Sequence, residues 1–189
     1  MGEPTFPEPP LAGTETETLL GSLERQRATF RWKVADLDAR GLSLRVGASE
    51  LTLGRLLKHL AYLEDLNFHR DLGGGPLPSP WSDRAADTVS TWAFASADLD
   101  PPATLYELWQ DAVTRSRSAV AQALTRGGPG LTFPVRGQSV TVRRLLVDMI
   151  EEYGRHTGHA DLLREAVDGR VGEDPPGRPH PYRHDAPPG

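Results

Sequence analysis

A carboxylate and an imidazole stand one helical turn apart in the C-terminal part of the sequence. Glu152 precedes His156 by four residues, which places both side chains on one side of a helix. The apolar residues around them recur at spacings of four and three, and His156 falls within that apolar stripe. Burying an acid beside an imidazole is costly unless a partner satisfies both groups. The pair is therefore a candidate for binding a metal.

A second histidine offers the missing partner. His59 lies three residues after Leu56 and four before Leu63, so it sits at the edge of another apolar helix face. If the two faces pack together, His59, Glu152 and His156 form a set of two imidazoles and one carboxylate. Such a set suits zinc, nickel, iron or manganese, and three protein ligands leave coordination positions open for water or substrate. We predict one divalent metal ion at these three residues.

Each of these residues also has a purely structural interpretation. His59 alone would be an ordinary histidine at the edge of a core, and Glu152 with His156 a surface pair worth about 0.3 kcal/mol. Tyr153 and His159 stand about one turn before and one turn after His156. Both are candidate catalytic residues, as proton donors or orienting groups, and a packing role is the alternative for both.

The composition limits the chemistry that the chain can perform alone. Its 189 residues are enough for one domain with a substantial core. Cysteine is absent, so metal ligands must be His, Asp or Glu, and a reacting thiol must come from a small molecule. A net charge of -5 does not support a nucleic-acid partner, and no apolar run is long enough to cross a membrane. The N-terminus lacks a secretory pattern, so we expect a cytoplasmic protein.

The apolar periodicity predicts four long helices. The first starts at residue 14 or 16 and runs to 38, with Gly41 as its stop and with the charged Arg27 and Lys33 outside its apolar face. The other three are expected at residues 52–71, from the Pro101-Pro102 pair to 126, and at 141–168, with Gly169 just past the last end.

The connections between these helices are unequal. A Gly- and Pro-rich segment from Gly73 leads into residues 81–100, where Trp81 and Trp92 suggest an aromatic-anchored crossover. The run LTFPVRGQSV before the last helix could form a β-like hairpin or an extended turn, and paired strands are the less favoured alternative. The fold class is therefore all-α, a four-helix bundle with a long crossover between the second and third helices. The predicted organisation is an extended segment at 1–13, the bundle at 14–170 and a Pro-rich tail at 171–189.

Two segments resemble the DinB-like (YfiT-like) metalloenzyme superfamily, in its actinobacterial branch near the N-terminal domain of mycothiol-dependent maleylpyruvate isomerase and the mycothiol S-transferases. They are LTLGRLLKHLAYLED around His59 and LLVDMIEEYGRHTGHADLLREAVDG around His156. Many members carry histidine where this chain has Glu152, whereas relatives of the isomerase carry glutamate. The resemblance implies a four-helix bundle with a divalent metal, often zinc or nickel. It does not extend to a second C-terminal domain of the isomerase type.

The resemblance also implies a class of reaction. Several members resemble enzymes that join a low-molecular-weight thiol such as mycothiol to an electrophile, so a metal-dependent thiol S-transferase is the leading hypothesis, with zinc as the expected metal and nickel as the alternative. A non-catalytic stress-response bundle that binds metal or a small molecule is the second hypothesis, and a metal-dependent hydrolase the third. We expect a small-molecule substrate, no nucleic acid, no membrane, and a homodimer with residues 81–100 as its contact.

Overall fold

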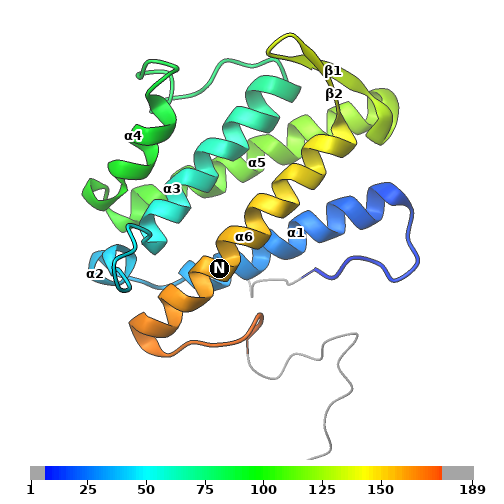
Figure 1. Ribbon diagram of the computed structural model, residues 1–189. Coiled ribbons are helices and arrows are strands. Elements are labelled where there is room, and N and C mark those ends of the chain that lie inside the picture. The colour runs from blue at the N-terminus through cyan, green and yellow to red at the C-terminus, as the bar shows by residue number, and fades with distance from the viewer. Residues whose placement is uncertain (1–6, 176–189) are drawn as a thin grey trace, which may run out of the picture.

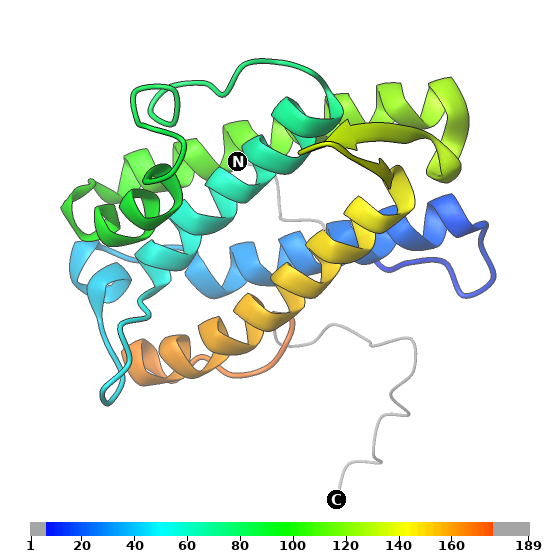
Figure 2. The same cartoon turned by 45° about the horizontal axis from the view of Figure 1, so that its top comes forward.

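Four long helices form the body of the protein in the computed structural model, which describes residues 7–175 (Figure 1). They are α1 (Glu15–Val34), α3 (Leu53–Glu64), α5 (Pro102–Gly127) and α6 (Val142–Asp168). α1 packs along α6, and α3 packs along α5, so the bundle consists of two helix pairs laid together (Figure 2). This confirms the prediction of an all-α bundle. None of the described helices is long and apolar enough to cross a bilayer.

The first helix ends earlier than the sequence pattern predicts. α1 stops at Val34, Asp36 adopts a left-handed backbone conformation with φ of 60°, and Asp38 caps a separate short helix, α2 (Ala39–Ser43). The Asp38 carboxylate accepts a hydrogen bond from the backbone N–H of Gly41 at 2.8 Å, so Gly41 lies inside α2 and is not the stop of α1. Periodicity alone did not reveal this break because the apolar spacing continues across it.

The second long helix changes from α-helical to π-helical winding at Asp65, about two thirds of the way along its length. α3 gives way to a π-helical segment, η1 (Asp65–Leu72), and the two together span residues 53–72, within one residue of the predicted 52–71 at each end. At the junction Asp65 is fully buried. It accepts hydrogen bonds from Arg115 of α5 and from the indole N–H of Trp81. A π-helical turn is uncommon and is often found near functional sites.

The crossover between η1 and α5 is ordered around aromatic side chains, as predicted. It contains α4 (Val89–Ala95) and the short 3-10 helix η2 (Ala97–Leu99). Trp81 is only 1% exposed and contacts both Tyr62 and Trp92. Since Trp81 packs inside the chain's own core, it is not available for the predicted dimer contact, which stays a prediction.

The segment before α6 forms a paired hairpin, which is the less favoured of the two alternatives that the sequence left open. Strand β1 (Thr132–Val135) pairs with β2 (Gln138–Thr141) in antiparallel register, and Val135 faces Gln138. The two residues between the strands, Arg136 and Gly137, have φ of 48° and 81°. Two left-handed residues in succession match the right-handed twist of a tight hairpin.

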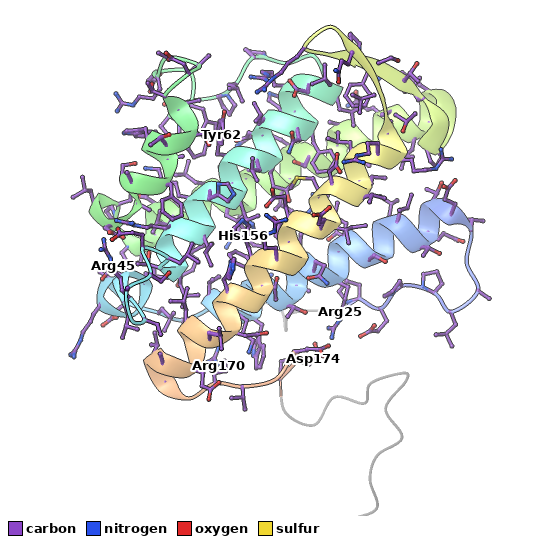
Figure 3. The ribbon with its side chains drawn as sticks, viewed as in Figure 1. Arg25, Arg45, Tyr62, His156, Arg170 and Asp174 are labelled. Atoms are coloured by element: carbon purple, nitrogen blue, oxygen red, sulfur yellow. The ribbon has the colours of Figure 1, made fainter. Side chains whose placement is uncertain are left out.

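The last helix has the boundaries that its capping residues predict. The Thr141 hydroxyl accepts a hydrogen bond from the backbone N–H of Arg144, and Gly169 takes the left-handed conformation at the C-terminal end. Beyond α6 the chain returns to α1, where the guanidinium of Arg25 binds the carboxylate of Asp174 (Figure 3). Residues 176–189 of the predicted tail and residues 1–6 of the predicted N-terminal segment lie outside the described residues.

A charged network lies inside the bundle, where the sequence pattern placed none. Arg27 is 3% exposed, although it was predicted outside the apolar face, and it binds the fully buried Glu64 through two N–H groups at 2.8 and 2.6 Å. The same carboxylate accepts a hydrogen bond from the Tyr153 hydroxyl at 2.7 Å, and that hydroxyl accepts one from Trp109 at 2.9 Å. The network ties α1, α3, α5 and α6 together at one level of the bundle.

Candidate metal centre

The two helices that carry the candidate ligands both start at a threonine cap. Thr52 accepts a hydrogen bond from the backbone N–H of Arg55 at 3.1 Å, and Thr141 does the same for Arg144. Each cap satisfies N–H groups that the first helical turn leaves without partners. The buried Leu56 and Leu60 hold α3 in the core and leave His59 at the edge of that apolar face. α3 and α6 thus present their half-buried polar residues to each other.

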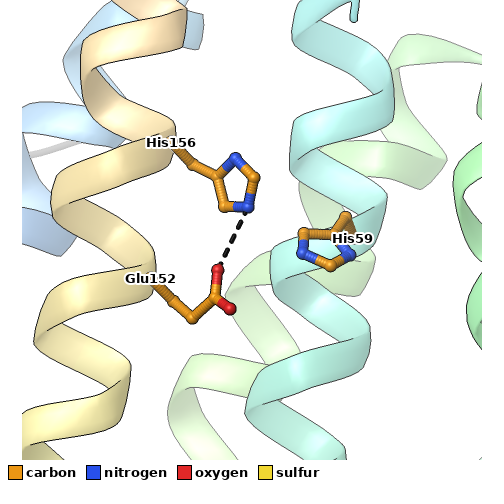
Figure 4. Close-up of side chains that lie close together, drawn as sticks. All are labelled: His59, Glu152 and His156. Atoms are coloured by element: carbon orange, nitrogen blue, oxygen red, sulfur yellow. Dashed lines mark ion pairs between the residues drawn. The ribbon is translucent and has the colours of Figure 1, made fainter.

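The structure brings the three predicted ligands together. One possible ligand atom from each of His59, Glu152 and His156 lies within 4.8 Å of the other two (Figure 4). Nε2 of His156 is 3.2 Å from a carboxylate oxygen of Glu152. The rings of His59 and His156 meet edge to face, with centroids 4.9 Å apart. Among the described residues this is the one group of three or more such side chains with that spacing.

Burial keeps both imidazoles neutral. Burial lowers the pKa of His59, and this effect outweighs the negative charge of Glu152, which acts to raise that pKa. For His156, burial together with the nearby His59, His159 and Arg155 lowers the pKa from 6.5 to about 4. A neutral imidazole at pH 7 cannot form an ion pair with Glu152, so their 3.2 Å approach brings a carboxylate oxygen against an uncharged ring.

The donor set fits a divalent cation. A metal binds the lone pair of a neutral imidazole. Rings that are already neutral at pH 7 do not have to release a proton before the metal binds. Two nitrogen ligands and one carboxylate oxygen match the preference of zinc and leave positions open.

The two candidate catalytic residues have different surroundings. His159 touches the candidate site, since its Nδ1 lies 3.3 Å from Nδ1 of His156. Tyr153 is fully buried, and its hydroxyl is engaged by Glu64 and Trp109 in the core network. The geometry therefore associates His159, and not Tyr153, with the three candidate ligands.

Residues 158–165, the GHADLLRE part of the segment quoted around His156, also contact α1. Lys33 is fully buried, and its Nζ lies 2.8 Å from a carboxylate oxygen of Asp161. Arg164 is 1% exposed and donates hydrogen bonds to the backbone carbonyls of Lys33 and Ala35, where α1 ends. Sequence periodicity missed these contacts and placed Lys33 on the outer face of its helix. A buried position for a charged residue is visible only once its partner on another helix is known.

The fold and the converging side chains define a class of protein, a helical bundle with a candidate metal site between α3 and α6. The family model for Mycothiol-S-transferase matches residues 18–169, which is most of the chain. The chain therefore belongs to the mycothiol S-transferase family, a family of mycothiol-related enzymes, and the predicted resemblance is confirmed. No curated protein matches the chain.

Proposed function

We propose that this protein is a metal-dependent S-transferase that joins mycothiol to a small electrophile. The observation that carries the proposal is the convergence of His59, Glu152 and His156 in a chain of this family that contains no cysteine. The sulfur nucleophile must then come from the co-substrate. A bound zinc ion would supply the Lewis acidity that lets a thiol lose its proton at neutral pH.

The protein's own residues have three roles in this proposal. His59 and His156, held neutral by burial, present nitrogen lone pairs between α3 and α6. Glu152 contributes one negative charge, so a bound divalent ion would leave the site with a net positive charge that attracts a thiolate. The neighbouring helix faces fix the three side chains before any ligand arrives, so little ordering is required on binding.

The reaction proposed for the co-substrates is a substitution or an addition at carbon. The sulfur of mycothiol forms a bond to the electrophilic carbon, and a leaving group departs with its electron pair, while the thiol proton passes to solvent. In an addition the proton instead ends on the adduct. Neither form requires an oxidant or a reductant.

Two adjacent glutamates give a matched test of this function. Glu152→Gln removes the candidate ligand charge, and Glu151→Gln removes a carboxylate that is 65% exposed and pairs with Arg155. The purified chain is loaded with zinc, and consumption of mycothiol is followed with a haloalkyl bimane as electrophile. We expect turnover in the wild type and in Glu151→Gln, and its loss in Glu152→Gln.

The other outcomes separate the competing functions. Zinc binding without any consumption of thiol would support the non-catalytic bundle. Cleavage of an ester or amide substrate in the absence of thiol would support the hydrolase. Equal turnover in wild type and Glu152→Gln would overturn the metal-centred reaction.

A further inference from the structure

We propose that His159 is a positioning residue that fixes the tautomer of His156 and so aims its Nε2 at the metal. The inference rests on the proposed metal site and deepens it. His159 meets the candidate site through the ring of His156, so it is not assigned a step in the reaction.

The two nitrogens of the His156 ring face different partners. Nε2 lies 3.2 Å from Glu152, on the side of the candidate metal position, and Nδ1 lies 3.3 Å from Nδ1 of His159. Figure 4 shows the first of these contacts, with the second ring nitrogen of His156 pointing away from Glu152. One ring thus joins the ligand set on one edge and a third histidine on the other.

Proton counting at this ring gives His159 its role. A neutral imidazole carries one proton, and coordination through Nε2 requires that the proton reside on Nδ1. The Nδ1–H then needs an acceptor, because the His156 side chain is only 12% exposed. His159 Nδ1 supplies that acceptor if its own proton is on Nε2. The two rings therefore share a single N–H···N hydrogen bond.

Three other carboxylates of α6 near the site are paired with basic residues. Asp148 pairs with Arg144, and Glu151 pairs with Arg155. Asp161 pairs with Lys33 across the α1 interface. Metal-binding histidines commonly hold their second nitrogen against a carboxylate or a backbone carbonyl. In this site a half-exposed imidazole three residues further along the same helix takes that place.

The test compares two replacements of His159 that differ in one hydrogen-bonding group. His159→Leu removes the acceptor, whereas His159→Asn keeps a side-chain oxygen near the position of Nδ1. Zinc affinity is measured by competition with a chromogenic chelator, and the tautomer of His156 by ¹⁵N NMR of the zinc-loaded protein. Thermal unfolding of the zinc-free forms controls for damage to the helix.

We expect His159→Leu to weaken zinc binding by about 10–100-fold. His159→Asn should recover most of that loss, and the wild type should show the His156 proton on Nδ1. Equal zinc affinity in wild type and His159→Leu, or a His156 proton on Nε2 in the zinc-loaded wild type, would overturn the inference. Zinc binding without thiol turnover would contradict only the proposed S-transferase function. A wild type that binds no zinc would contradict both that function and the role of His159.

Discussion

His59 of α3 and His156 of α6 face each other across the bundle, with their ring planes inclined by 77° and their centroids 4.9 Å apart. Neither helix contains the site alone, since one imidazole comes from the second long helix and the other from the last. The packing of α3 against α6 is therefore part of the site's chemistry, and a change that separates these helices should weaken metal binding before it unfolds the domain.

The first prediction concerns the contribution of His59. His59→Ala leaves only two protein ligands, so we expect zinc affinity to fall by more than about 100-fold, beyond what loss of an indirect partner costs. The measurement is zinc retained per chain after dialysis, together with the dissociation constant. His69→Ala serves as a control, because His69 lies on η1 outside the group of three. If both variants lost zinc equally, α3 would not provide a specific ligand.

The second prediction concerns the pH dependence of stability without metal. The pKa of His156 falls from 6.5 to about 4 on folding, so between these values the unfolded chain binds more protons than the folded one. The contribution of His156 to the free energy of unfolding is therefore fully present above about pH 6.5 and declines as the pH falls toward 4. Urea unfolding in the presence of a chelator should show a loss of about 1–2 kcal/mol from this group between pH 7.5 and pH 5.

A variant separates this effect from general acid sensitivity. His156→Gln removes the titrating group, so the stability lost on acidification should shrink by that amount. A part should remain, because burial also lowers the pKa of His59. An unchanged pH dependence in His156→Gln would show that the ring is not protected from protonation in the folded state.

The third prediction distinguishes a structural role of Tyr153 from a catalytic one. Tyr153→Phe removes the hydrogen bond to Glu64 and leaves the indole N–H of Trp109 without its acceptor. We expect the free energy of unfolding to fall by about 1–3 kcal/mol. Zinc affinity and turnover of the folded protein should stay close to those of the wild type. Loss of turnover without loss of stability would return Tyr153 to the reaction.

The fourth prediction concerns the anchor of the crossover. Trp81→Phe keeps an aromatic ring in the core but removes the N–H that donates to Asp65 at 2.8 Å. Asp65 keeps both hydrogen bonds from Arg115, so the expected loss is about 1–3 kcal/mol and not that of an unpaired buried charge. Trp92→Phe is the comparison, because Trp92 is only half-buried. A larger loss for Trp92→Phe would contradict this account.

The sequence determined the long helices and the identity of the candidate ligands. The threonine caps at Thr52 and Thr141, the terminal Gly169 and the four-residue spacing of Glu152 and His156 are local features. They depend on side chains and backbone groups within one or two turns of each other, so they can be inferred without knowing what else packs nearby.

The tertiary structure decided the features that depend on partners distant in the sequence. Arg27 and Lys33 are charged and look like surface residues, yet Glu64 and Asp161 on other helices draw them into the interior. Likewise, the hydrogen bond from Arg115 to Asp65 and the meeting of His59 with Glu152 arise only when α5 and α6 pack against α3. A charged side chain can be buried only if an oppositely charged or hydrogen-bonding partner lies next to it. The periodicity of one helix does not show which residue of another helix that partner is.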